Sequence, residues 1–103
     1  MPLKNMKPTG GRSMNNGVIK TLLIEDDEED RMLLHDLLGQ ASGDRFHVEW
    51  AGTLESGLRS LDEKGPFDIV LLDLGLPDAQ GLNTLEGMRQ KTERLPIIPL
   101  TGH

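Results

Sequence analysis

Acidic side chains follow two separate apolar segments of this sequence. Residues 18–24 form a short, mostly apolar run that stops at Glu25 and Asp26, and residues 67–73 form the most continuously apolar stretch, which closes on Asp73. In an open sheet of parallel strands, ligands bind beyond the carboxyl ends of the strands. If the two segments are neighbouring strands, the three carboxylates therefore converge on one cleft.

Carboxylates that converge repel each other, which raises their affinity for protons or requires a cation. Mg²⁺ suits such a place because it takes carboxylates, waters and phosphate oxygens as ligands. An ionised carboxylate is also a nucleophile toward phosphorus and would give an acyl phosphate. One Mg²⁺ shared by Asp73 and an incoming phosphoryl oxygen would supply the positioning and charge neutralisation on which phosphoryl transfer depends. Thr101, which closes another apolar segment, could donate a hydrogen bond to a second phosphoryl oxygen.

Each of these residues also has a simpler interpretation. The acidic run 25–30 alone is more typical of a solvated helix start, and an aspartate after a strand often caps the next turn. Thr101 also fits a strand end through β-propensity alone. The combination of Glu25 and Asp26 after one strand with Asp73 after another favours the functional interpretation.

The rest of the sequence alternates between two periodicities. Short apolar or alternating segments predict strands at residues 18–24, 46–51, 67–73 and 96–101. Leucines at helical spacing predict helices at about 28–41, 54–64 and 82–92. Asp27 and Thr53 stand where helix N-caps are expected. Strands joined by helices of this length form a parallel sheet through right-handed crossovers, with helices on both faces, so the order βαβαβαβ predicts an α/β fold.

Length and charge narrow the classes of function. The 103 residues fit one domain, and a net charge of −6 argues against direct binding of nucleic acid. The chain has no cysteine and no apolar run long enough to span a membrane. Residues 1–17 lack periodicity and are interpreted as a flexible tail, which leaves residues 18–103 as the domain.

Three segments, residues 22–27, 69–81 and 95–102, together resemble the receiver domains of two-component response regulators. The resemblance implies a flavodoxin-like doubly wound sheet of order 2-1-3-4-5. It implies a phosphoacceptor at Asp73, a metal-binding acidic pair at Glu25 and Asp26, a further metal ligand in the carbonyl of Gly75, and a phosphoryl-sensing hydroxyl at Thr101. It also implies Mg²⁺ as cofactor, a histidine kinase or histidine phosphotransfer protein as phosphoryl donor, a bacterial cytoplasmic setting, and no enzymatic activity beyond the domain's own phosphorylation and dephosphorylation.

The sequence also departs from the family pattern. Receiver domains continue with a helix, a fifth strand that ends in a lysine, and a last helix, whereas this sequence ends at His103. We therefore expect a sheet of order 2-1-3-4, incomplete charge stabilisation at the site, and self-association through the exposed edge of the fourth strand. A phosphorylation-incompetent interaction module is the alternative function. A phosphohydrolase is disfavoured because Gly75 stands where such enzymes usually carry a second aspartate.

The remaining conspicuous residues have ordinary interpretations. His35, His47 and His103 lack the spacing of metal ligands and are expected at the surface. Trp50 is expected to be a partly buried packing residue. Pro99 removes a backbone donor, which suits an edge strand.

Overall fold

The computed structural model describes residues 17–42 and 45–100 of the chain. The elements are β1 (Ile19–Ile24), α1 (Glu28–Ser42), β2 (Phe46–Ala51), α2 (Leu54–Lys64), β3 (Ile69–Asp73), β4 (Gly75–Leu76), β5 (Ala79–Gln80), α3 (Leu82–Lys91) and β6 (Ile97–Leu100). Residues 1–16 of the predicted tail (residues 1–17), Thr101 and His103 lie outside the described residues.

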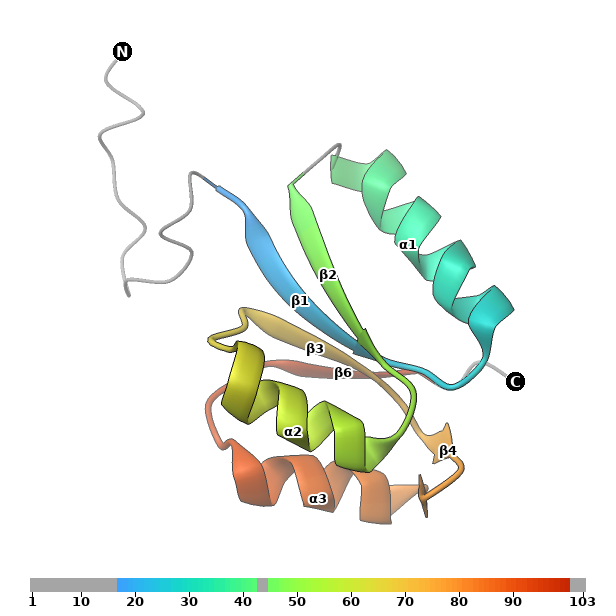
Figure 1. Cartoon of the computed structure of the whole chain (residues 1–103), viewed down its shortest axis with the longest axis vertical. Coiled ribbons are helices and arrows are strands. Elements are labelled where there is room, and N and C mark those ends of the chain that lie inside the picture. Colours follow the sequence, from blue (N-terminus) through green and yellow to red (C-terminus); the bar gives the residue numbers. More distant parts are fainter. Residues whose placement is uncertain (1–16, 43–44, 101–103) are drawn as a thin grey trace.

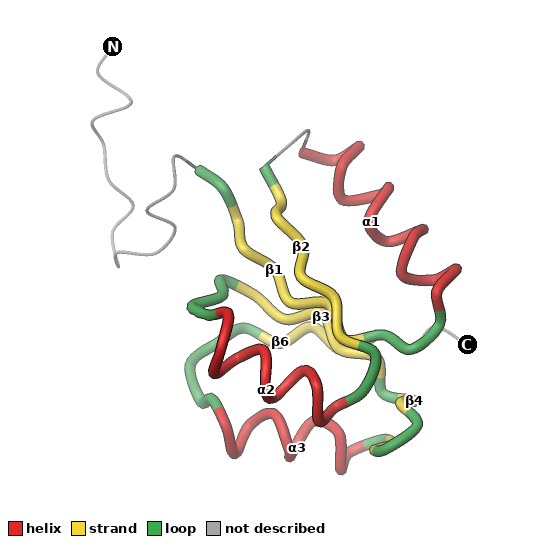
Figure 2. The backbone as a smooth tube through the Cα atoms, viewed as in Figure 1, coloured by secondary structure: helices red, strands yellow, loops and turns green. Residues whose placement is uncertain are grey.

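Four parallel strands form one sheet of order β2-β1-β3-β6 (Figures 1 and 2). β6 is the fourth strand along the predicted pattern, so the predicted order 2-1-3-4 and the doubly wound α/β fold are confirmed. β3 lies between β1 and β6, which explains why Val70, Leu71 and Leu72 are all buried. The carboxyl ends of β1 and β3 are neighbours, because Ile24 pairs with Leu72.

Side-chain caps fix where the first two helices begin. The Oδ1 of Asp27 accepts hydrogen bonds from the backbone N–H groups of Glu29 and Asp30, at 2.8 and 3.1 Å. Thr53 and Ser56 form a reciprocal capping box at the start of α2. Both predicted N-caps are therefore confirmed, and each ties a helix to the end of the preceding strand.

The core lies on one face of the sheet, under α2 and α3. Side chains alternate along each strand, so one set from β1 and β3 points to this face. Its buried members are Leu22, Ile24, Val70 and Leu72, packed with Phe67, Leu76 and Met88. Figure 1 shows α2 and α3 side by side here, whereas α1 lies apart from them, beside β2.

The other face of the sheet is covered less completely. α1 exposes Met32, Leu33 and Leu37, and the sheet exposes Trp50 by 46% and Ile98 by 45%. Trp50 is thus partly buried, as expected. Within the described residues β6 is an edge strand, as Pro99 predicted.

One local feature differs from the sequence prediction. The sequence pattern predicts no strand between residues 73 and 82, but β4 and β5 pair there as a small antiparallel hairpin. Gly81 follows with a φ of +62°, in the region that favours glycine. This hairpin stands directly after β3 and therefore borders the end of the sheet that carries Asp73.

Candidate functional site: an acidic cluster at the strand ends

Three carboxylates meet at the carboxyl ends of β1 and β3. Ligand oxygens of Glu25, Asp26 and Asp73 all lie within 4.8 Å of one another. Glu25 and Asp73 are almost fully buried, with exposures of 3% and 2%, while Asp26 is exposed. We call these three residues the acidic cluster. The sheet order brings them together as the sequence predicted, and their oxygen donors are of the kind that a hard divalent cation prefers.

The two carboxylate oxygens of Asp73 have different surroundings. Oδ1 accepts a hydrogen bond of 2.9 Å from the backbone N–H of Gly75. Oδ2 is buried and has no hydrogen-bond partner among the described residues. A buried carboxylate oxygen without a donor is costly. Asp73 is therefore held by one oxygen and presents the other to the acidic cluster, where a cation or a proton can satisfy it.

The electrostatics of the cluster show most clearly at Glu25. The pKa of Glu25 is raised from its ordinary 4.5 to about 7, mainly by burial and also by the neighbouring Asp73, against a lowering hydrogen bond from the backbone N–H of Asp27. A protonated Glu25 can donate a hydrogen bond to Asp73, whereas two ionised carboxylates repel. The raised pKa of Glu25 thus favours its protonated form beside Asp73.

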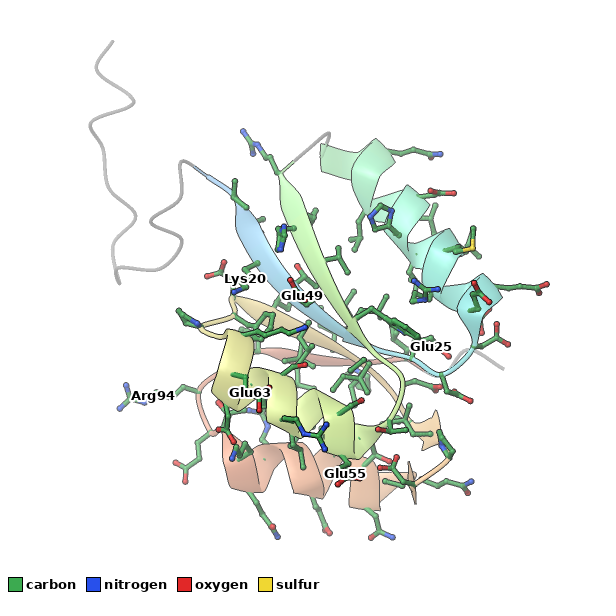
Figure 3. The ribbon with its side chains drawn as sticks, viewed as in Figure 1. Lys20, Glu25, Glu49, Glu55, Glu63 and Arg94 are labelled. Carbon is green, nitrogen blue, oxygen red and sulfur yellow. The ribbon has the colours of Figure 1, made fainter. Side chains whose placement is uncertain are left out.

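The loop between β1 and α1 positions both Glu25 and Asp26. Glu25 donates its backbone N–H to the carbonyl of Ala51 at 2.9 Å, and its Oε2 accepts from the N–H of Asp27 at 3.2 Å. Figure 3 shows Glu25 near the start of α1, far from Lys20 at the opposite end of the sheet. Residues 25–30 are six consecutive acids, and the first basic residue after them in the sequence is Arg31.

Two contacts at this end of the sheet were not predicted from the sequence. The indole Nε1 of Trp50 donates a hydrogen bond of 2.7 Å to the carbonyl oxygen of Glu25. Asp78, in the β4–β5 turn, accepts from the backbone N–H groups of Leu54 and Glu55 at 2.8 and 3.0 Å. These bonds outweigh the effect of partial burial and lower the pKa of Asp78. Both contacts join segments more than twenty residues apart, and no local pattern signals them.

The other predicted site residues are placed as follows. Gly75 contacts Asp73 through its N–H, and the role expected of its carbonyl stays a prediction. Thr101 lies outside the described residues; it follows Leu100, which pairs with Asp73. His35 and His47 are exposed, as expected, and the Nε2 of His47 lies 3.2 Å from the Oε2 of Glu49.

Comparisons with known proteins agree with this fold. The sequence model of the response regulator receiver domain matches residues 21–103, so the chain belongs to that family. The transcriptional regulatory protein BasR of Escherichia coli K12 is 39% identical over 84 residues, which are 82% of this chain and 36% of BasR. CpxR of the same strain is 39% identical over 83 residues, 81% of this chain and 33% of CpxR. The chain thus spans about a third of these relatives.

Solved structures of response-regulator proteins also match the fold of this chain. The non-phosphorylated receiver domain of HemR from Leptospira biflexa matches with a TM-score of 0.61 and 38% identity, over 79% of this chain and 62% of that one. A chain from the complex of histidine kinase ThkA with response regulator TrrA matches with a TM-score of 0.70 and 27% identity, over 82% and 70%. Among the described residues, no helix is long and apolar enough to cross a membrane.

Proposed function

We propose that this chain is a phosphoacceptor module of a two-component system, which takes a phosphoryl group onto Asp73 with the help of Mg²⁺. The observation that carries the proposal is the buried Oδ2 of Asp73, which lacks a hydrogen-bond partner among the described residues and lies within an acidic cluster. A purely structural aspartate at a strand end would be expected to satisfy both oxygens.

Each residue of the site has its own role in this proposal. Glu25 and Asp26 would hold Mg²⁺ together with Asp73, and Mg²⁺ when bound supplies charge neutralisation for the phosphoryl group. The N–H of Gly75 fixes Asp73 through Oδ1 and so orients its carboxylate toward the metal and the phosphoryl group. A bond forms between a carboxylate oxygen of Asp73 and phosphorus while the bond from phosphorus to the donor's atom breaks, and the donor leaves with that electron pair. We assign the carbonyl of Gly75 to the metal and the hydroxyl of Thr101 to a phosphoryl oxygen.

The proposed donor is a histidine kinase or a histidine phosphotransfer protein in the bacterial cytoplasm. Support comes from the likeness to a chain of the kinase–regulator complex ThkA–TrrA and from relatives that are bacterial regulators. The protein would act on no separate substrate and would assist only its own phosphorylation and hydrolysis. The net charge of −6 gives no basis for a direct nucleic-acid partner.

Intact mass after incubation with acetyl phosphate tests the phosphoacceptor role. We expect one added phosphoryl group on the native chain with Mg²⁺, and none without Mg²⁺ or in the Asp73→Asn variant. Asp36→Asn removes an exposed carboxylate of α1 and serves as a control that should label normally. Labelling that persists in Asp73→Asn would overturn the proposal. A folded native chain that gains no mass would instead favour the alternative function, an interaction module that is not phosphorylated.

A further proposed property is self-association through β6. Within the described residues this strand is an edge, and Ile98 on it is 45% exposed. Unpaired strand edges with apolar side chains recruit other strands. Sedimentation over a range of concentrations should show a mass that rises above that of one chain, and a constant monomer mass would contradict this.

A further inference from the structure

A single side chain contacts both ends of the loop that carries Glu25 and Asp26. At the start of the loop, the Nε1 of Trp50 donates to the carbonyl oxygen of Glu25 at 2.7 Å. At its end, the guanidinium carbon of Arg31 lies 4.0 Å from the centre of the indole ring of Trp50. Residues 25–31 are thus closed into a ring by a residue of the neighbouring strand β2.

Hydrogen bonds also connect the residues of this ring to one another. The N–H of Asp27 donates to the carboxylate of Glu25, and the carbonyl of Asp27 accepts from the N–H of Arg31 at 2.9 Å. A movement of Glu25 therefore carries Asp27 and the start of α1 with it. Trp50 restrains the same ring from outside through one hydrogen bond and one cation–π contact.

The charge of this loop explains why an external restraint is needed. Residues 25–30 are six consecutive acids, and Arg31 is the first cation after them. Like charges crowded at one place repel, and the Nη2 of Arg31 lies 3.5 Å from the Oε2 of Glu28 within this acidic segment. The stacked Arg31 brings one positive charge to the acidic segment, and the indole holds that charge in place.

The exposure of Trp50 points away from a simple packing role. Its side chain is 46% exposed, although burial of an indole is among the largest apolar contributions a residue can make. Its N–H is nevertheless bonded to a backbone carbonyl, and its face to a guanidinium. The polar N–H of Trp50 therefore has a hydrogen-bond partner, whereas nearly half of its side chain stays exposed to solvent.

We propose that Trp50 is a positioning residue for the Mg²⁺ ligands, which holds Glu25 and Asp26 in their binding arrangement by clamping the loop of residues 25–31. The proposal rests on the proposed function, because it assumes that these two carboxylates bind Mg²⁺. It goes beyond that function by assigning a role to a residue outside the acidic cluster.

The test compares Trp50→Phe with Val48→Ala. Phenylalanine keeps an aromatic ring but removes the N–H, whereas Val48 lies on the same strand and face and takes no part in the hydrogen bond or the cation–π contact of Trp50. Mg²⁺ binding to the full chain is measured by calorimetry. Since the variant loses one hydrogen bond, we expect affinity to fall by about three- to tenfold in Trp50→Phe and to stay unchanged in Val48→Ala. Equal affinities in all three proteins would overturn the proposal.

A finer variant separates the N–H from the size of the ring. Replacement of Trp50 by 3-benzothienylalanine keeps both fused rings and exchanges only the N–H for sulfur. We expect the same loss of Mg²⁺ affinity as in Trp50→Phe. Native affinity in this variant would contradict a role for the hydrogen bond, even if Trp50→Phe were too unstable to measure.

Amide hydrogen exchange without metal distinguishes failure of this proposal from failure of the proposed function. The N–H groups of Asp27, Glu29 and Asp30 are bonded within the loop and its cap, so they should exchange faster in Trp50→Phe than in the native chain or Val48→Ala. A native chain that binds no Mg²⁺ would defeat the proposed function. Unchanged exchange in Trp50→Phe would defeat the clamp, whatever the outcome with Mg²⁺.

The chain supplies its own optical readout. Trp50 is its one tryptophan, and it has no tyrosine, so fluorescence excited near the indole band reports this residue alone. Addition of Mg²⁺ to the native chain should change the intensity or wavelength of that emission. The change should be absent in Glu25→Gln at the same concentration of Mg²⁺, and an identical change in both proteins would contradict a connection between the ligands and the indole.

Discussion

The two faces of the sheet differ in how completely their side chains are buried. Under α2 and α3, the strand residues Leu22, Ile24, Val70 and Leu72 are fully buried in one core. On the face toward α1, Leu23 is buried, but Trp50 and Ile98 are nearly half exposed. Strand alternation places Glu25 and Asp73 in step with this second, less covered face, since they follow Leu23 and Leu71 by two residues.

This difference suggests that stability and function are separated across the sheet. The covered face supplies most of the buried apolar area, and therefore most of the hydrophobic stabilisation. The α1 face carries Asp73, whose Oδ2 has no hydrogen-bond partner among the described residues, and the exposed apolar side chains of Trp50 and Ile98. The following variants test the separation, in order of the expected effect.

Truncation of a leucine on each face should give unequal losses. Leu72→Ala removes a fully buried side chain from the core and should lower the free energy of unfolding by about 2–5 kcal/mol. Leu33→Ala, at 57% exposure on α1, should lower it by about 0.5 kcal/mol or less. Urea denaturation measures both. Similar losses would show that α1 is packed in solution and would break the comparison.

The acidic cluster should make the native chain less stable as the pH rises. Because the pKa of Glu25 is about 7 in the folded chain and 4.5 ordinarily, the fold gains protons relative to the unfolded chain between these values. The stability that protonation provides is fully present below about pH 4.5 and is lost as the pH rises toward 7. Urea denaturation across this range should show that decline.

Asp73→Asn sharpens the same test. It removes the charge that faces Glu25 and should stabilise the chain by about 1–2 kcal/mol near pH 8, with a smaller gain near pH 5. Part of the pH dependence should remain, since burial is the larger cause of the raised pKa. A variant less stable than the native chain near pH 8 would mean that the cluster is not strained.

Two helical glycines should respond to alanine with opposite signs. A Cβ at Gly57 in α2 would lie 2.3 Å from the Cδ1 of Ile24, so Gly57→Ala should destabilise the core by about 1–3 kcal/mol, less the gain in helix propensity. Gly39 in α1 has nothing within 4 Å, so Gly39→Ala should stabilise by about 0.5–1 kcal/mol. Thermal unfolding of the two variants measures this contrast, and effects of one sign at both positions would contradict it.

Much of this arrangement could be predicted because its signals are local. The apolar runs before Glu25 and Asp73, the leucine spacing and the caps at Asp27 and Thr53 set the elements, and the resemblance to receiver domains implies the sheet order. Once that order is known, the meeting of the three carboxylates follows. The role of Thr101 stays a prediction, because that residue lies outside the described part of the chain.

The unpredicted contacts depend on tertiary packing. Trp50 reaches the carbonyl of Glu25 only because β2 lies beside β1 in one particular register. Asp78 reaches the start of α2 only because residues 75–80 form a hairpin. An indole or a carboxylate in sequence carries no sign of which distant backbone group it will bind. The raised pKa of Glu25 likewise depends on burial that spacing alone cannot measure.

Pro99 limits how further strands can pair with the edge of β6. The carbonyls of Pro96 and Leu100 accept hydrogen bonds from β3, so the alternation of a parallel strand turns the backbone of Ile97 and Pro99 outward. A strand that added there would find donor and acceptor at Ile97 but only an acceptor at Pro99. This gap interrupts the repeating ladder that amyloid-like stacking requires. This edge of β6 is thus poorly suited to open-ended growth of fibrils.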